Sequence, residues 1–300
     1  MTLAAQVKFV EELGGIAPEI QQKGTHREGM TEKLIRGYEI AKKVYDADYL
    51  AVRLVTGFHA TKIEAELNSY VINNKIEYSE QDVSDLVEYL NMNDFDDETE
   101  KMGVYVGSLI SILTEKNEKL GKRTIIKIPE NRLDYLGEYC RKFDVIKVGV
   151  NYGTEVFRVA RKGNLLYVED CKGNSFAQDA GCINGDVKTI VGVNVSGDWF
   201  AKNASQFNGK VGVVAGMNVS GSGFARIVGE DGERVEAIIG VNVTGNNFAF
   251  GAEFKDGPVG KILYNSREAD IGYNRVIEGL NREYNLGLKK VKVRKERSES

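Results

Sequence analysis

The chain has 300 residues and a formal net charge of −4, with 42% hydrophobic and 28% charged residues. This composition is typical of a folded soluble protein and argues against a disordered or fibrous chain. No stretch approaches the roughly 20 consecutive apolar residues that span a bilayer, so we expect no membrane-spanning segment. Phosphate binding requires a basic surface, and we therefore do not expect the acidic body of the protein to bind nucleic acid.

The three cysteines, Cys140, Cys171 and Cys182, are odd in number and lack the spacing of a zinc or redox site. We therefore expect free thiols, with no metal site and no cofactor. The first residues carry no secretory signal pattern. Free thiols without a secretory signal favour a cytoplasmic protein.

Residues 1–122 are predicted to form a mainly helical domain. Ser79 and Asp82 have the spacing of a helix N-cap, and Gly121 is expected to end the last of these helices. Several segments carry apolar residues at helical spacing, one of them the stripe Met30, Leu34, Tyr38, Ala41 and Tyr45.

The pattern changes near residue 123, where β-strand signals begin. Residues 124–128 and 145–150 read as strands, and residues 131–143 read as a helix between them because apolar residues recur there three and four positions apart. Glycine becomes frequent and charge becomes sparse after this point, as expected for stacked strands joined by tight turns.

A six-residue phrase recurs three times at a constant spacing, without insertions. It reads Gly-Val-Asn-Val-Ser-Gly at residues 192–197, and close variants begin at Gly216 and Gly240. Each copy is followed by a Phe-Ala pair: Phe200-Ala201, Phe224-Ala225 and Phe248-Ala249. A fixed period of this length predicts a repeat architecture, in which each unit packs only on its neighbours.

We expect residues 123–265 to form a parallel β-solenoid with about 24 residues per coil, because stacking requires coils of equal length. Like residues then lie above one another, so the repeat predicts an amide ladder and a stack of phenylalanine rings, with Gly192, Gly216 and Gly240 at a corner. The ladder would comprise Asn194, Asn218 and Asn242. The alternative is an antiparallel array of β-hairpins, which the Asn-Gly pairs at residues 184–185 and 208–209 also suit.

The Gly-x-x-Phe-Ala copies resemble the glycine-repeat β-helix at the end of glutamate synthase large subunits. The resemblance rests on glycine and one aromatic residue in each copy. It implies a solenoid and carries no activity across to this chain.

Residues 266–286 are predicted to form a helix that caps the C-terminal end of the solenoid, since an uncovered end exposes apolar core and unpaired backbone. Residues 287–300 form a basic tail, expected to be disordered, and contact between Lys289–Arg297 and nucleic acid or an acidic partner stays open. The expected fold class is therefore α+β: a helical N-terminal region, then a capped β-solenoid.

The expected function is that of a non-catalytic scaffold or binding protein that presents a repetitive β-face to a protein or polymer. Strict alternation along the strands would place the odd-numbered residues inside and the even-numbered residues outside. Ile190, Val214 and Ile238 would lie on the outer face, where they suggest a homo-oligomer interface. The expected binding residues are Lys188, Asn194, Ser196, Trp199, Asn218, Ser220, Asn242 and Thr244.

The alternative function is an enzyme, possibly one that acts on carbohydrate, with a cleft between the helical region and the side of the solenoid. β-Helices can hold paired carboxylates for glycoside hydrolysis. The spacing of the candidate carboxylates in the sequence does not identify a pair. The candidates are Glu155, Glu169, Asp170, Asp179, Asp186 and Asp198.

Overall fold

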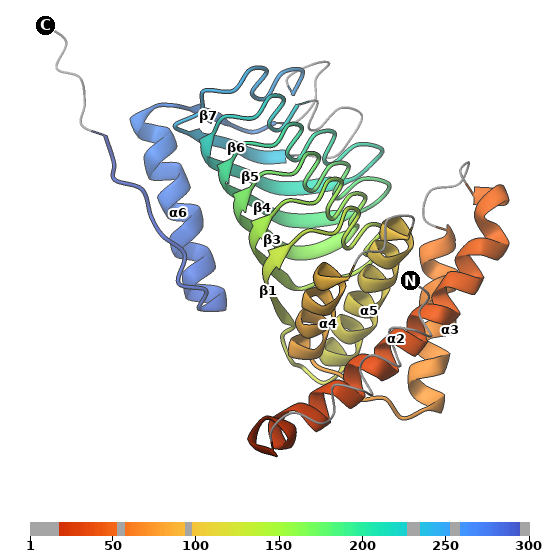
Figure 1. Ribbon diagram of the computed structural model, residues 1–300. Helices are drawn as coiled ribbons and strands as arrows, with labels where there is room; N and C mark the ends of the chain where they lie inside the picture. Colours follow the sequence, from red (N-terminus) through yellow and green to blue (C-terminus); the bar gives the residue numbers. More distant parts are fainter. Residues whose placement is uncertain (1–17, 53–57, 94–97, 227–234, 253–258, 295–300) are drawn as a thin grey trace, which may run out of the picture.

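The computed structural model describes residues 18–52, 58–93, 98–226, 235–252 and 259–294 (Figure 1). Within these ranges, four helices precede seven parallel strands, and one helix follows them. The elements are α2 (Pro18–Val52), α3 (Phe58–Asn73), α4 (Glu80–Met92), α5 (Thr99–Lys119), β1 (Ile125–Asn131), β2 (Val145–Asn151), β3 (Lys162–Cys171), β4 (Asp186–Val195), β5 (Lys210–Val219), β6 (Val235–Val241), β7 (Ile262–Tyr264) and α6 (Arg267–Tyr284).

The helical region covers the first coil of the solenoid (Figure 1). Ser79 and Asp82 form the predicted capping box at the start of α4. The Ser84 hydroxyl of α4 donates to the Lys127 carbonyl of β1, 2.8 Å away. On α5, Gly103 lies so close to the backbone at residue 135 that a larger side chain would not fit, and its carbonyl accepts from Gly137 N at 3.1 Å. One continuous hydrophobic core joins the helices to the solenoid interior.

The seven strands form one sheet in sequence order, and every neighbouring pair is parallel. The β-solenoid is therefore confirmed, and the antiparallel hairpin array is wrong. The offset between paired residues is not constant along the sheet: Val145 of β2 pairs with Leu165 of β3, whereas Thr189 of β4 pairs with Val213 of β5. The first coils are thus four residues shorter than the repeat that reveals the fold.

The predicted helix at residues 131–143 is wrong, because this segment is the return path of the first coil. β1 runs through residue 131, and turns occupy residues 134–139. Tyr135, Gly137 and Tyr139 have φ of 59°, 70° and 55°, so residues with a positive φ alternate with residues without one. Leu133, Leu136 and Cys140 are buried at intervals of three and four residues, and this spacing imitates a helix.

The interior of the later coils contains a stack of aromatic rings. The rings of Phe200 and Phe224 lie 5.0 Å apart with an interplanar angle of 1°, and those of Phe224 and Phe248 lie 5.4 Å apart at 6°. The predicted phenylalanine stack is confirmed. The recurring glycines lie within β4, β5 and β6 and not at a corner, because each makes room for a ring: a Cβ at Gly216 would lie 2.6 Å from the Phe224 ring.

The predicted assignment of inner and outer strand residues is wrong for the middle of each strand. Ile190 is fully buried in the interior core, as are Val214 and Ile238, whereas Val191 and Val193 face α6 on the outer side. The homo-oligomer interface proposed on Ile190, Val214 and Ile238 therefore does not exist on the surface. Strict alternation fails because the strand changes phase between residues 187 and 190 and again at residue 194, which has a φ of 51°.

The C-terminal helix α6 exists as predicted, but it covers the outer face of the sheet and not the end of the solenoid. Tyr273 and Ile277 pack against strand residues such as Val191 and Ile239. The helix runs along the stack of strands in Figure 1. The sheet is consequently covered on both faces, by its own interior and by α6.

The described part of the C-terminal segment, up to residue 294, packs against α6, contrary to the expected disordered tail. Leu286 and Leu288 are buried, and Asn274 exchanges two hydrogen bonds with the backbone of Val291. Arg294 Nε donates to Asp270 Oδ2 at 2.8 Å. Residues 295–300 of the expected tail lie outside the described residues.

Cys140, Cys171 and Cys182 are free, as expected, and all three are buried. Within the described ranges, none of the helices has the length and apolarity required to cross a membrane.

Candidate functional site

Six of the eight expected binding residues form one exposed surface at the carboxyl ends of β4, β5 and β6. We call it the polar corner, and it consists of Asn194, Ser196, Asn218, Ser220, Asn242 and Thr244, all of which are exposed. Like residues occupy successive coils, so neighbours of one kind are about 4.8 Å apart along the stack. Trp199 follows the first of these strands by a few residues. Lys188 lies at the opposite end of β4.

The asparagines of the polar corner form the predicted amide ladder. Asn218 Nδ2 donates to Asn194 Oδ1 at 2.8 Å, and Asn242 Nδ2 donates to Asn218 Oδ1 at 3.0 Å. Their φ angles of 51°, 55° and 53° are left-handed, a conformation that asparagine tolerates better than most residues. An amide nitrogen has two hydrogens, so each ladder bond leaves one hydrogen available to a ligand.

The hydroxyl residues of the polar corner form a second column beside the ladder. The backbone N–H groups of Ser196, Ser220 and Thr244 each donate to the preceding coil at 2.8 Å, which fixes the column in register. A third column continues the surface, because Asp198 accepts a hydrogen bond from Ser222 N at 2.6 Å. The corner therefore presents hydroxyl and amide groups at regular intervals on a rigid backbone.

Exposed aromatic rings lie beside this array. The Trp199 side chain is 44% exposed, and its ring lies against Gly223 of the next coil, where a Cβ would come within 2.9 Å. Lys202 Nζ lies 4.7 Å from the centre of the Trp199 ring. Tyr152 is 45% exposed and lies 4.7 Å from Lys172 Nζ. The rings are held in place by the coils around them.

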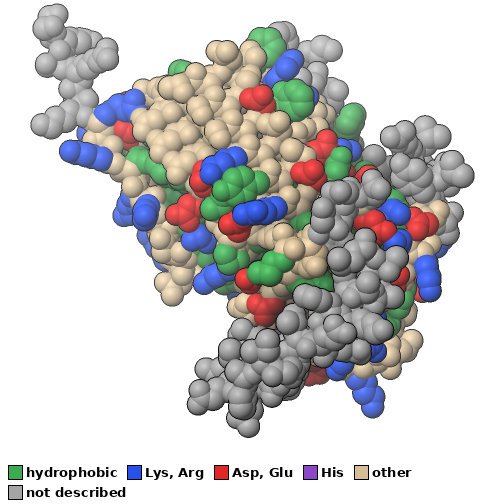
Figure 2. Space-filling view, viewed as in Figure 1, with side chains coloured by type: hydrophobic (Ala, Val, Ile, Leu, Met, Phe, Trp, Pro, Cys, Tyr) green, Lys and Arg blue, Asp and Glu red, His purple; other side chains and the backbone are tan. Residues whose placement is uncertain are grey.

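Three charged side chains lie at or beside the polar corner: Asp198 in the third column, Lys202 beside Trp199, and Arg294, whose Nη2 donates to Asn242 Oδ1 at 3.4 Å. Figure 2 shows a broad area of backbone and uncharged polar side chains over the upper part of the solenoid, with charged side chains around its edges. Charges on the earlier coils pair with one another: Lys172 lies 3.7 Å from Asp170, and Arg132 lies 2.6 Å from Glu130. The amide ladder and the hydroxyl column are themselves uncharged, which suits a ligand without net charge.

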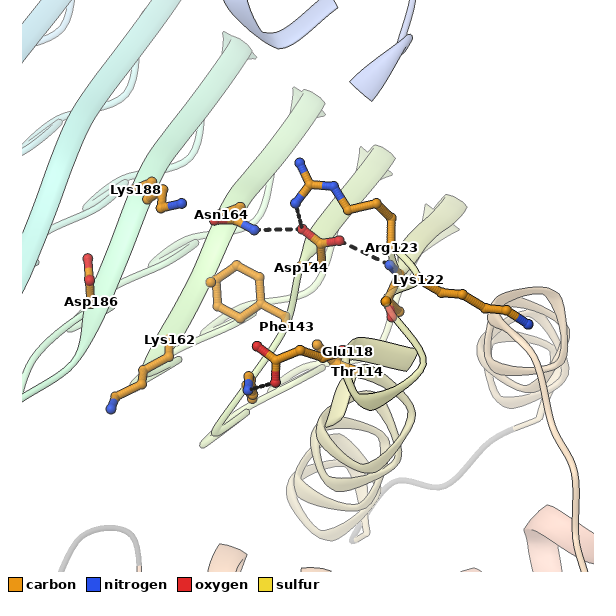
Figure 3. A pocket seen from close by; sticks show the side chains of 14 residues that line it. Thr114, Glu118, Lys122, Arg123, Phe143, Asp144, Lys162, Asn164, Asp186 and Lys188 are labelled. Carbon is orange, nitrogen blue, oxygen red and sulfur yellow. Dashed lines mark hydrogen bonds and ion pairs between the residues drawn. The ribbon is translucent and has the colours of Figure 1, made fainter. Parts of the chain in front are cut away.

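Lys188 belongs to a second feature, a depression of about 400 Å³ where the strands begin (Figure 3). We call it the basic depression. The last turns of α5 form one side, and the residues that begin β2, β3 and β4 form the other. Its lining residues include Thr114, Glu118, Arg123, Lys142, Phe143, Asp144, Lys162, Asn164, Asp186 and Lys188.

Two of the carboxylates in the basic depression are already neutralised. Asp144 accepts hydrogen bonds from Arg123 Nη1 at 3.2 Å, Thr124 N at 3.0 Å and Asn164 Nδ2 at 2.7 Å (Figure 3). Glu118 accepts a hydrogen bond from Lys142.

Arg123, which lines the depression, also contacts the end of α6. It donates to Glu283 at 2.8 Å and lies over the Tyr284 ring. The pKa of Glu283 is lowered, first by its hydrogen bond with Tyr284 and further by Arg123 and Lys188.

The six carboxylates considered for an enzyme do not converge on one site. Asp186 lines the basic depression, and the other five do not. Asp198 caps a backbone N–H at the polar corner, and Glu169 lies 3.7 Å from Lys147. Glu155 pairs with Arg158, Asp170 with Lys172, and Asp179 accepts from Gln178 at 3.1 Å. Among the described residues, no group of three or more His, Cys, Asp or Glu side chains could hold a metal ion.

Among the described carboxyl groups, that of Glu138 has the most strongly shifted pKa, and the sequence did not indicate it. Its side chain is 2% exposed at the junction between α5 and the first coil. Burial raises its pKa to about 8, although Arg158, with Nε 3.5 Å away, acts in the opposite direction. Glu138 Oε2 has no hydrogen-bond partner among the described residues. The mistaken helix at residues 131–143 concealed this position.

Comparisons with known proteins supply no further assignment. No protein-family model, no curated protein and no solved structure matches this chain. The functional argument therefore depends on the geometry of the two surfaces alone.

Proposed function

We propose that the protein is a non-catalytic binding module, and that its polar corner binds an extended, uncharged polymer, a linear polysaccharide. The observation that supports this proposal best is the exposed column of Ser196, Ser220 and Thr244 beside the Asn194–Asn218–Asn242 ladder. The solenoid repeats the same groups on each coil, and repeat proteins use such extended surfaces for binding.

The chemistry of the corner favours sugar over protein. Hydroxyl groups donate and accept hydrogen bonds, and the free amide hydrogens donate, which suits the many hydroxyls of a sugar chain. Trp199 supplies an apolar face on which a sugar ring can pack. A protein partner would require a larger apolar centre, and the described residues of the corner provide no such patch.

The enzymatic alternative has less support. Catalysis by paired carboxylates requires two of them on either side of one substrate bond. The candidate carboxylates lie on different parts of the solenoid, and most of them pair with a neighbouring cation or cap a backbone group. We therefore assign the corner a binding role.

Affinity electrophoresis in native gels tests the proposal. Soluble laminarin, xylan and dextran are cast separately into the gel, and we expect at least one of them to retard the protein. Ser220→Lys places a long cationic side chain in the middle of the array and should abolish the retardation. Ser69→Lys makes the same change on an exposed face of α3 and serves as the matched control.

The proposal is overturned if no polymer retards the protein. It is also overturned if the Ser220→Lys and Ser69→Lys variants are retarded equally, because binding would then occur elsewhere. Circular dichroism of both variants confirms that the fold is intact before the comparison is made.

A further inference from the structure

A larger depression lies in the helical region, between α3 and α5, and we call it the helical depression. Its volume is about 680 Å³, which is in the range of pockets for small molecules. Ile72 is 64% exposed and Leu120 is 59% exposed, so both present apolar surface to solvent. The apolar side chains that line the depression are those of Val71, Ile72, Ile76, Ile112, Leu113 and Leu120.

A carboxylate is buried in the wall of the helical depression. The side chain of Glu64 on α3 is 6% exposed, and its Oε1 accepts a hydrogen bond from Arg141 Nη2 at 2.8 Å. No described residue donates to Glu64 Oε2, and this atom is not fully enclosed, so it keeps contact with the space that Glu64 lines. A carboxylate accepts hydrogen bonds through both oxygens, and Oε2 is therefore available to a donor on a ligand.

The charges next to Glu64 favour a cation. Arg141 Nη2 also donates to Glu115 at 2.9 Å, so two carboxylates share one guanidinium group and one negative charge is left without a counter-charge. Burial raises the pKa of Glu64, Arg141 lowers this pKa, and Glu115 raises it. A ligand with a single positive charge would balance the three groups.

Three lysines also line the helical depression, but all three are exposed: Lys75, Lys116 and Lys119. Solvent and salt screen exposed charges strongly, so these amines affect the buried end of the depression less than Arg141 does. The charges that shift the pKa of Glu64 are those of Arg141 and Glu115. The buried carboxylate therefore determines which sign of charge the inner end accepts.

We propose that the helical depression binds a primary alkylamine. The ammonium group would donate to Glu64 Oε2, and the alkyl chain would lie against Ile72 and Leu120. A hydrogen bond between an ammonium group and a carboxylate is charge-assisted and stronger than a bond between neutral groups. This site lies in the helical region, so it does not depend on the function proposed for the polar corner.

Tyr78 adds an aromatic group to the same wall. Its ring is buried, it lines the depression, and its hydroxyl donates to the Leu109 carbonyl at 2.8 Å. Burial raises the pKa of Tyr78 most, and the charge of Glu64 raises it further, which places the two side chains near each other. An aromatic ring close to a bound cation adds to the attraction.

Isothermal titration calorimetry of the full chain at constant ionic strength tests the proposal with four probes: octylamine, butylamine, 1-octanol and octanoate. We expect octylamine to bind. Butylamine lacks most of the apolar chain and 1-octanol lacks the charge, so each should bind roughly tenfold or more weakly. Octanoate would place a second anion beside Glu64, and we expect no detectable binding.

Ile72→Lys places a cation at the depression and removes apolar surface from it, so it should weaken octylamine binding roughly tenfold or more. Met92→Lys is the matched control, because it makes the same kind of change at an exposed residue of α4 and should bind as the wild type does. Glu64→Gln keeps the shape of the side chain and removes its charge. This variant should bind octylamine and 1-octanol with similar affinity.

The proposal is overturned if octylamine does not bind, or if 1-octanol or octanoate binds the wild type as tightly as octylamine does. Equal octylamine binding by Ile72→Lys and Met92→Lys would show that the amine binds elsewhere, and would overturn it too. Both of these residues are exposed, so this comparison remains decisive even where Glu64→Gln fails to fold. Equal binding of butylamine and octylamine would contradict the role given to the apolar wall.

Discussion

The Phe224 ring lies directly over the backbone of Gly216, eight residues earlier on the same coil. A Cβ built on Gly216 would lie 2.6 Å from two atoms of that ring, closer than real Cβ contacts. The same relationship joins Gly192 to Phe200 and Gly240 to Phe248. Each repeat therefore contains a glycine and a phenylalanine eight residues later that fit together. The glycine recurs because a Cβ at its position would collide with the phenylalanine ring.

Gly216→Ala should destabilise the protein by about 1–3 kcal/mol, because the added methyl group displaces a ring that is itself stacked on both sides. Gly279→Ala on α6 is the matched control: a Cβ there meets nothing within 4 Å, and alanine favours a helix by about 1 kcal/mol. Urea unfolding of both variants measures the difference. Equal or greater stability of Gly216→Ala would contradict the packing described here.

Substitution of Asn218 should separate the two roles of the ladder residue. Asn218→Gly loses the amide hydrogen bonds but adopts the left-handed conformation without strain. Asn218→Ala loses the same hydrogen bonds and is also strained in that conformation. We expect Asn218→Ala to be less stable than Asn218→Gly by about 1 kcal/mol, which is the cost of the left-handed conformation. Thermal unfolding of the pair checks the order, and the reverse order would be inconsistent with a left-handed corner at this position.

Glu138 should make stability depend on pH. Its carboxyl favours the folded state while protonated, because its pKa rises from 4.5 to about 8 on folding. The stabilising effect is therefore complete below the unfolded pKa and is lost as pH rises through about 8. The groups that face it are Arg158, Glu155, Glu100 and Tyr139.

Glu138→Gln resembles the protonated form and should raise the free energy of unfolding by roughly 1–3 kcal/mol at alkaline pH, with little effect in mild acid. Urea unfolding across the pH range measures this change. Glu88→Gln, an exposed change on α4, should leave the pH profile as it is. Parallel profiles for the wild type and Glu138→Gln would show that the carboxyl does not titrate as described.

Arg294 should hold the C-terminal segment against α6. It bonds to Asp270, whose side chain is 1% exposed, so Arg294→Met leaves a buried carboxylate without its cation. We expect a loss of about 1–3 kcal/mol and faster proteolysis after Lys289 or Lys290. Lys292→Met removes a neighbouring exposed cation and should change neither property. Unchanged proteolysis in Arg294→Met would indicate that the segment is held by other contacts.

The repeat made the solenoid predictable because stacked coils place like residues together. Asn194 and its equivalents, and Phe200 and its equivalents, each occupy one position of a strict period, so the ladder and the ring stack followed from the spacing. The early coils were harder to describe, because they are shorter and do not share the repeated phrase. Their strands at residues 124–128 and 145–150 are recognisable, but the return path between them imitates a helix.

The alternation of apolar and polar residues along the strands could not by itself show which residues face the solenoid interior. Val187 and Val195 do face the core, but Val191 and Val193 between them face α6, because the strand changes phase twice. The second change occurs at the left-handed Asn194, and the hydrophobic pattern of the sequence indicates neither change. The covering by α6 turned an apolar outer face into a second core.

The candidate sites were predictable only in part. The polar corner was recognised from the repeat, although it was placed on a strand face and joined to Lys188. The basic depression combines Thr114 of α5 with Lys162 and Lys188 of different coils. The register of the sheet and the packing of α5 against the first coil bring these residues together, and no local sequence pattern indicates it.

The fluorescence of Trp199 tests the proposed function most directly, because it is the single tryptophan of the chain and lies beside the polar corner. Titration with laminarin, xylan and dextran should produce a saturable change in emission with the polymer that retards the protein, and Ser220→Lys should remove that change. The absence of a saturable change with every polymer, or a change that persists in Ser220→Lys, would contradict the assignment of the polar corner as the binding surface.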